Sequence, residues 1–252
     1  MPLETKSRVR TPLRPRLDLP PPFRLLMLRE AGDAFAHART IASAEGAGTL
    51  VHVGRFDLAE FAVMLEPEEP LRTARRALYT GLCALGDALA ARAPPEKPIS
   101  FDWPDAIRVD GGLVGGVRLA WPPLADEDEP PAWLVFGAMI RVVAMDEGEP
   151  GLRPLAAALD QEGFDDLDPG RLVESFARHL MATFDSCREH GFGEVAKRYL
   201  SRLGPANGQR PDIDQQGDLL VRRPGGEVER RSIIGALAAP SWLDPKTGGP
   251  RA

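Results

Sequence analysis

The chain has 252 residues, enough for one large domain or for a core domain with a small one beside it. Hydrophobic residues make up 43% of it and charged residues 27%, values that are ordinary for a globular protein with a core of normal size. Since 31 Lys and Arg stand against 37 Asp and Glu, the formal net charge is −6, which argues against nonspecific binding to nucleic acid or to an anionic membrane as the main task.

The beginning of the chain predicts an extended arm. Residues 1–22 contain basic residues and several prolines but no apolar signal core, and no stretch of the chain approaches the length of a membrane span. The two cysteines, Cys83 and Cys187, are too few for a disulfide framework or a cysteine-rich metal site. Both fall in apolar helical patterns, so we expect buried free thiols and a reducing, cytoplasmic setting.

The first half of the chain predicts strands and helices in mixed order. The apolar run 23–29 predicts a strand, and Asp33 is a plausible N-cap for a helix that ends near Gly46. Leucines recurring every three or four positions predict a long helix over residues 71–92, stopped by the prolines that follow. Short strands are expected at residues 49–53 and 61–65.

The middle of the chain predicts a hairpin and a central strand. Asp110-Gly111-Gly112 supplies the positive φ angles of a tight turn between strands at 107–110 and 113–120. The apolar run 133–144 predicts a long strand buried in a sheet.

The last third predicts two helices and a small β unit. Asp168-Pro169 has the N-cap and first-turn proline of a helix that ends near Gly191, and a shorter helix follows it. Gln216-Gly217 predicts the turn of a hairpin, and the segment EVERRSII (227–234) predicts a further strand. The tail from Asp244 is expected to be loose.

Together these elements predict an α+β protein in which a mixed β-sheet is flanked by helices and followed by a small C-terminal β module. The expected divisions are an extended N-terminal arm (1–22), a main domain (23–203), a linker, and the β-rich module (209–243).

Residues 101–121 (FDWPDAIRVDGGLVGGVRLAW) combine two specialised features. Trp103-Pro104 fixes the backbone and presents a flat apolar face, while Gly115-Gly116 allows another backbone or a ligand to approach a strand closely. A rigid aromatic beside a bare glycine strand would form a slot for a flat molecule. The alternative is that Trp103 belongs to the core and that the glycines only permit tight packing.

The segment Asp102-Trp103-Pro104-Asp105, followed by a hairpin and Gly-Gly, resembles the Lys-Trp-Pro-Asn-Asp and Lys-x-x-Gly signature of biotin protein ligases in the biotin/lipoate protein ligase family. Residues 136–142 resemble the later Gly-x-Gly-x-Asn strand of that family, residues 171–202 its paired helices, and the C-terminal hairpin its small SH3-like cap. The resemblance covers residues 23–235. It implies the class II synthetase/biotin ligase-like fold, with residues 23–203 as the ligase-like catalytic-type domain.

The resemblance also implies a chemistry, from which this sequence departs. Such proteins make an acyl-adenylate from biotin or lipoate and ATP with Mg²⁺, and transfer the acyl group to a lysine of a carrier domain. Two anions meet in that reaction, so the site needs cations. Here Leu113 stands at the catalytic lysine, Asp102 at the first lysine and Arg141 at the later asparagine. Only Val53-Gly54-Arg55 remains of the glycine/arginine loop.

The candidate site residues follow from this alignment. The catalytic group is unknown, with Arg55 and Arg141 as possible substitutes for the lost lysine. Asp102 and Asp105 are considered as holders of Mg²⁺ through water, although Asp102 alternatively caps a turn or pairs with an arginine. Arg118 and Arg141 are alternatively solvent-facing strand residues. The expected ligand-binding residues are His52, Trp103, Pro104, Asp105, Leu113, Gly115, Gly116 and Arg118.

Three functions stay open at this point. The first is a divergent, ATP-dependent biotin/lipoate ligase-like enzyme, and the second is a catalytically inactive module that binds a small acid or a carrier domain. The third is a scaffold without a ligand, in which sheet edges pair two subunits as a homodimer. Arginines that converge on the Gly115-Gly116 strand would favour the enzyme, and arginines tied up by carboxylates would disfavour it. A site filled by Leu113, Trp103 and Met139 would favour the scaffold.

Overall fold

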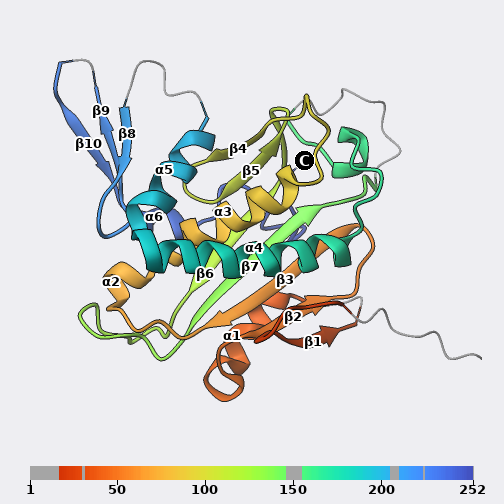
Figure 1. Cartoon of the computed structure of the whole chain (residues 1–252), viewed down its shortest axis with the longest axis horizontal. Helices are drawn as coiled ribbons and strands as arrows, with labels where there is room; N and C mark the ends of the chain where they lie inside the picture. The colour runs from red at the N-terminus through yellow and green to blue at the C-terminus, as the bar shows by residue number, and fades with distance from the viewer. Residues whose placement is uncertain (1–16, 30–31, 146–154, 205–209, 224, 252) are drawn as a thin grey trace, which may run out of the picture.

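The computed structural model describes residues 17–29, 32–145, 155–204, 210–223 and 225–251. Most of the predicted arm and most of the predicted linker lie outside these residues. A seven-stranded sheet with the order β1-β2-β3-β7-β6-β5-β4 forms the body, and a separate three-stranded sheet with the order β10-β9-β8 stands beside it (Figure 1). The predicted α+β fold is therefore confirmed.

The main sheet is antiparallel except for the pair formed by β1 and β2. These two strands run parallel because α1 (Ala34–Glu45) carries the chain back between them. Most of the predicted strands are confirmed with shifted ends, and β4 was not predicted. The strands are β1 Arg24–Leu28, β2 Thr49–Val53, β3 Leu58–Leu65, β4 Ile99–Asp102, β5 Ala106–Val109, β6 Gly112–Ala120 and β7 Leu134–Arg141.

Helices cover both faces of the sheet. The helical face carries α3 (Ala77–Ala90), α4 (Pro169–His190) and α5 (Phe192–Arg202), and the opposite face carries α1 (Figure 1). We call this opposite side the α1 face. A short 3₁₀ turn, Leu159–Glu162, precedes α4.

The predicted helix over 71–92 is in fact two helices. Residues Leu71–Ala74 form α2, and α3 begins at Ala77. Between them the backbone N–H groups of Arg76, Leu78 and Tyr79 donate to the carbonyl three residues earlier, each at 3.0 Å. This tighter turn interrupts the α-helical ladder. The leucine pattern continues across the break, which is why the sequence did not reveal it.

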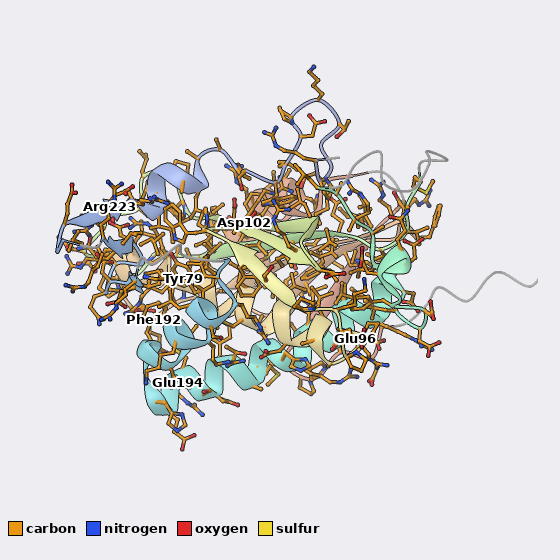
Figure 2. The ribbon with its side chains drawn as sticks, turned by 90° about the horizontal axis from the view of Figure 1, so that it is seen from above. Tyr79, Glu96, Asp102, Phe192, Glu194 and Arg223 are labelled. Carbon is orange, nitrogen blue, oxygen red and sulfur yellow. The ribbon has the colours of Figure 1, made fainter. Side chains whose placement is uncertain are left out.

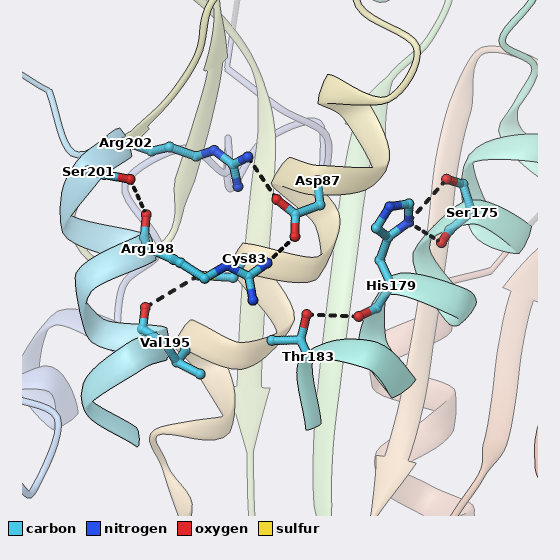
Figure 3. Close-up of polar contacts among 9 residues, drawn as sticks. All are labelled: Cys83, Asp87, Ser175, His179, Thr183, Val195, Arg198, Ser201 and Arg202. Atoms are coloured by element: carbon cyan, nitrogen blue, oxygen red, sulfur yellow. Dashed lines mark hydrogen bonds and ion pairs between the residues drawn. The ribbon is translucent and has the colours of Figure 1, made fainter. Parts of the chain in front are cut away.

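Ion pairs and hydrogen bonds fasten the helices of the helical face to one another (Figure 3). Asp87 of α3 pairs with Arg198 and, at 2.7 Å, with Arg202 of α5. His179 of α4 lies 2.8 Å from the Ser175 carbonyl oxygen, so it is a satisfied helical group. Cys83 is buried in this layer and contacts the Val195 carbonyl.

The expectation that both thiols are buried is wrong for the second one. Cys187 lies near the end of α4 and is only half-buried.

The small sheet consists of β8 (Arg210–Ile213), β9 (Leu219–Arg222) and β10 (Val228–Arg231). The predicted turn is confirmed, since Gly217 has a φ of 88°. The prediction of a strand to residue 234 is wrong, because residues Ile233–Leu237 form the short helix α6. Tyr79 lies on the side of the body that faces the small sheet, and its hydroxyl donates to the Gly217 carbonyl at 2.6 Å (Figure 2).

The last described residues, 240–251, form a loop closed by hydrogen bonds, so the expectation of a loose tail from Asp244 is wrong for them. We call residues 240–251 the C-terminal segment. The N–H of Arg251 donates to the Trp242 carbonyl at 2.7 Å, and the N–H of Asp244 donates to the Gly249 carbonyl at 2.9 Å. The segment lies behind the main sheet in Figure 1, on the side away from α3 and α4. Among the described residues, no helix is long and apolar enough to cross a membrane.

Candidate functional site

The hairpin β5-β6 has the tight turn that the sequence predicted. Asp110 and Gly111 both have positive φ, 49° and 82°, and they join Val109 to Gly112 directly. The register then shifts, because Ile107 pairs with Gly115 and leaves Val114 as an extra residue on β6. This is a β-bulge.

Gly115 makes that bulge possible. Its φ is 152°, and a Cβ added there would lie 2.0 Å from the carbonyl oxygen of Met139 on β7. No side chain larger than hydrogen therefore fits at this point of the sheet.

Gly116 is crowded on two sides. A Cβ at Gly116 would lie 2.4 Å from the Asp105 carbonyl oxygen and 2.4 Å from both Cδ1 and Nε1 of Trp242. The indole ring of the C-terminal segment thus rests directly on the bare backbone of β6. A tryptophan therefore lies against the glycine strand at the place where the sequence predicted a slot for a flat ring.

The tryptophan in the slot is not the one that the sequence suggested. The Trp103 ring packs against the main core on the helical face, and its Nε1 donates to the Tyr79 hydroxyl at 3.0 Å. The neighbouring Pro104 carbonyl accepts from Tyr199 in the same layer. Trp242 escaped notice because it lies in a short segment without periodicity. Its one visible signal is a large aromatic residue beyond the last strand.

The α1 face does gather several of the predicted positions. Leu113 and Met139 join Trp242 in an apolar cluster, together with Leu58 and Ala106. Leu113 is 8% exposed, and its N–H donates to the Leu155 carbonyl at 2.8 Å. The Lys-x-x-Gly spacing of the family signature fits a second pair of residues, with Gly112 at the lysine and Gly115 at the glycine. A Cβ at Gly112 would lie 2.6 Å from the Cβ of Ala157, so neither position supplies a cation.

Two of the arginines proposed for the site are held by carboxylates. Arg55 donates twice to Asp57, at 3.0 and 2.7 Å. Arg118 reaches Asp33 at 2.9 and 3.3 Å and stacks 4.4 Å from the centre of the Phe35 ring. Such two-point pairs fix a guanidinium strongly, so a ligand phosphate would have to displace a carboxylate from each.

The third arginine, Arg141, serves the backbone of the C-terminal segment. Its guanidinium donates to the carbonyls of Ala157 at 3.2 Å, Pro250 at 2.8 Å and Arg251 at 3.2 Å. In the sequence it looked like a replacement cation. In the structure it anchors the loop that covers the α1 face.

Asp105 is fully buried under that loop. It is 0% exposed, its Oδ1 accepts from the Ser241 hydroxyl at 3.2 Å, and its Oδ2 has no partner. Burial raises the pKa of this carboxyl to about 7, although the bond from Ser241 works in the opposite direction. Asp105 is therefore largely uncharged in mildly acidic solution and about half ionised near neutral pH.

Asp102 does not share that environment. Its side chain is 45% exposed, and it accepts from Arg108 at 2.7 Å, which is the arginine pair considered as its alternative role. No group of three or more His, Cys, Asp or Glu residues among the described ones is arranged to hold a metal ion.

His52 faces away from the tryptophan slot. It lines a cleft of about 840 Å³ at the start of α4, together with Arg55 and Asp168. Burial lowers the pKa of the imidazole, and Nδ1 lies 3.1 Å from the Glu60 carbonyl. Glu60 itself is 2% exposed, and burial raises the pKa of its carboxyl. Its Oε1 accepts from the N–H of Ala34 at the start of α1.

The substitution Asp33→Asn tests whether the ion pair with Asp33 keeps Arg118 from binding an anionic ligand. Asp33 also caps α1 by accepting from the Ala36 N–H at 2.9 Å. Its half-burial alone would raise its pKa, but the bond from Ala36 and the guanidinium of Arg118 lower it. Asparagine keeps the cap and releases Arg118, so we expect inorganic pyrophosphate to bind about tenfold more tightly by calorimetry, as expected for a freed charge-assisted contact.

Asp168→Asn is the matched control. Asp168 caps α4 in the same way, through the Arg171 N–H at 2.9 Å, but it does not contact Arg118. Pyrophosphate binding should be unchanged in this variant. Equal affinities in both variants would show that Asp33 does not withhold Arg118.

Comparisons with known proteins place this geometry in context. A sequence model described as the biotin/lipoate A/B protein ligase family matches residues 19–201. A biotin–[acetyl-CoA-carboxylase] ligase of Paracoccus denitrificans is 28% identical over 188 residues, which cover 65% of this chain and 73% of that protein.

Among solved structures, a biotin protein ligase-like protein of unknown function from Silicibacter sp. TM1040 is 27% identical. It matches with a TM-score of 0.74 over 88% of this chain and 99% of its own. The biotin protein ligase of Aquifex aeolicus, 18% identical, matches with a TM-score of 0.64 over 83% of this chain and 95% of its own. The same enzyme in complex with biotin and ATP matches with a TM-score of 0.60, at 18% identity, over 82% of this chain and 94% of its own.

Proposed function

The chain belongs to the biotin/lipoate A/B protein ligase family, and on that basis we propose that it binds a small carboxylic acid, or the carrier domain to which such an acid is attached, without forming the acyl-adenylate. The proposed ligands are therefore those of the family, but the first chemical step of the family, formation of the acyl-adenylate, does not occur. It also keeps the protein in a reducing compartment such as the cytoplasm, in agreement with two free thiols.

The proposal rests on one observation: the arginine side chains near the site are already bound to carboxylates or to backbone carbonyls of the protein itself. Forming an acyl-adenylate brings a carboxylate and a triphosphate together, and preorganised positive charge has to offset their repulsion. The resemblance places Leu113 at the lysine of the family signature. Arg55 and Arg118 are tied to Asp57 and Asp33, and Arg141 holds backbone carbonyls. Replacing that lysine by leucine removes an interaction that is typically worth about 3 kcal/mol in the transition state.

The residues of the α1 face do not fit ATP and Mg²⁺. Asp105 is buried with a raised pKa, Asp102 is paired with Arg108, and no metal-ligand cluster is present among the described residues. Hard cations require several oxygen ligands, most of them charged. We therefore assign no step to ATP.

The unpaired, buried oxygen of Asp105 favours a protein that binds a ligand over a scaffold without one. A buried carboxyl oxygen without a partner is unfavourable in a protein interior, and a packing surface alone gives no reason to keep one. A ligand that forms a hydrogen bond with this oxygen would supply the reason.

An active ligase is the second candidate, because the Paracoccus denitrificans protein to which the chain is 28% identical is a ligase. In that case Arg55 and Arg118 would have to leave their carboxylates when ATP binds.

Native mass spectrometry distinguishes the two candidates. The full chain is incubated with ATP, Mg²⁺ and, in turn, biotin, lipoate or octanoate. We expect a complex with the acid and no acyl-AMP, because the lysine is absent. An acyl-AMP peak would contradict the proposal and would make Arg55 and Arg118 the first residues to substitute. If the chain binds none of the acids and no biotinyl or lipoyl carrier domain, the result would contradict the proposal and favour a scaffold without a ligand.

A further inference from the structure

The C-terminal segment is fastened to the α1 face at three points. The indole Nε1 of Trp242 donates to the Val117 carbonyl at 3.1 Å, and the Ser241 hydroxyl donates to Asp105 at 3.2 Å. Arg141 closes the far end by donating to the carbonyls of Pro250 and Arg251. Trp242 is only 1% exposed, so the segment is seated and not merely adjacent.

The apolar contacts of the segment form a cluster of their own. The main core of the helical face and the core beneath α1 are separate from it. The segment supplies the cluster with Trp242 and the half-buried Leu243, and strands β3, β5, β6 and β7 supply the rest. Removal of the segment would therefore expose an apolar floor around Gly116 and leave both larger cores intact. The floor consists of Leu58, Ala106, Leu113 and Met139.

The indole ring shows what this floor accepts. Its Cδ1 and Nε1 atoms lie against β6 where Gly116 lacks a side chain, and its N–H donates to the Val117 carbonyl of that strand. A flat ring with an N–H donor at its edge reproduces both contacts. A ring without a donor would leave the buried Val117 carbonyl without a hydrogen bond at that position.

Closure of the segment is imperfect. Asp105 Oδ2 is buried and has no partner while Ser241 occupies the other oxygen. A buried polar atom without a partner disfavours the state that buries it. Opening of the segment would return this carboxyl to solvent. The closed state is therefore destabilised by the unpaired oxygen of Asp105, next to its contact with Ser241.

We propose that the C-terminal segment is an internal occupant of a ligand site on the α1 face, and that the site admits a carboxylic acid with a flat, N–H-bearing ring once the segment leaves. The acid and its ring class rest on the proposed function, and the closing by the C-terminal segment goes beyond it. Biotin has ring N–H groups, whereas lipoate and octanoate have none, so the site favours biotin among these three.

Trp242→Ala removes the internal ring, and Lys246→Ala is the matched control because Lys246 is exposed in the same segment. Calorimetry with biotin and with lipoate compares both variants with the unaltered chain. We expect Trp242→Ala to bind biotin at least about tenfold more tightly and lipoate no more than about twofold more tightly, with Lys246→Ala unchanged. Equal biotin affinity in the unaltered chain and in Trp242→Ala would overturn the proposal.

Indole separates this inference from the proposed function. The space left in Trp242→Ala should take up indole and raise the melting temperature of the variant, as cavities made in protein cores bind small rings. The same concentration of 1-methylindole, which lacks the N–H, should raise it less. Rescue by indole with no biotin binding to any variant would support the site and contradict the acid-binding function. Equal rescue by the two indoles would overturn the donor requirement.

Hydrogen exchange on the unaltered chain covers the case in which Trp242→Ala does not fold. The N–H groups of Asp244, Gly248 and Arg251 are closed by hydrogen bonds within the segment. If the segment opens independently, these amides exchange at least about tenfold faster than the amides of β7. Equal rates would show that the segment opens only with the whole fold, and would overturn the proposal.

Discussion

Replacing Gly115 by alanine is expected to destabilise the protein by at least about 4 kcal/mol and to leave little soluble chain, since severe steric conflict is among the few causes of losses this large. The methyl group would lie 2.0 Å from the Met139 carbonyl oxygen and 3.1 Å from the Cα of Ile140, and both atoms belong to the backbone of the central strand β7. Neither can move without breaking the pairing of β6 with β7. Urea denaturation followed by circular dichroism measures the loss.

Gly111→Ala is the control for backbone strain without a clash. Gly111 also has a positive φ, 82°, but no heavy atom lies within 4 Å of a Cβ built there. Its substitution should cost about 1 to 2 kcal/mol, the usual penalty for a left-handed conformation. If the two variants lost similar stability, the close approach of β7 to Gly115 would not be the cause.

Asp105→Asn is expected to remove most of one pH dependence of stability. Burial raises the folded-state pKa of Asp105 to about 7, from the usual value of 3.8 for an aspartate. The folded protein therefore holds this proton more tightly than the unfolded chain does. The stability that the protonated carboxyl contributes is full below about pH 4 and declines as the pH rises through 7. Between pH 5 and 8 this decline amounts to about 3 kcal/mol, at 1.36 kcal/mol for each pKa unit.

The asparagine variant cannot ionise, so the decline should be absent from it. Relative to the unaltered chain, its free energy of unfolding should rise by about 3 kcal/mol between pH 5 and pH 8. Asp102→Asn, at an aspartate whose side chain is 45% exposed and paired with Arg108, should show no such gain. Parallel pH profiles for Asp105→Asn and the unaltered chain, measured in urea, would show that the carboxyl is not buried as described.

Periodicity and turn chemistry were enough to predict the fold class. The caps of α1 and α4 were read from Asp33 and Asp168, and the structure confirms both hydrogen bonds. The β5-β6 turn followed from Asp110-Gly111. The strand β4 was missed because its four residues, Ile99–Asp102, are too few to show a period.

The candidate site was harder to predict because its contacts join distant parts of the chain. Nothing near Arg118 in the sequence indicates that Asp33, 85 positions away, neutralises it. The sequence suggested Trp103 for the slot and did not point to Trp242. Only the folded sheet shows that the first meets Tyr79 on the helical face while the second meets Gly116 on the other. Local sequence rules predict helices, strands and turns. Which partner each side chain contacts is decided by tertiary packing.

The position of Trp242 in the chain also bears on the order in which the molecule is completed during synthesis. Its contact at Val117 spans 125 residues, and Trp242 follows the end of α5 by about 40 residues. At ordinary rates of translation of about 5 to 20 residues per second, this interval lasts roughly 2 to 8 seconds. Throughout it, every strand of the main sheet has already been made and the floor around Gly116 has no cover. A small molecule present in the cell thus meets the uncovered sheet before the chain's own indole does.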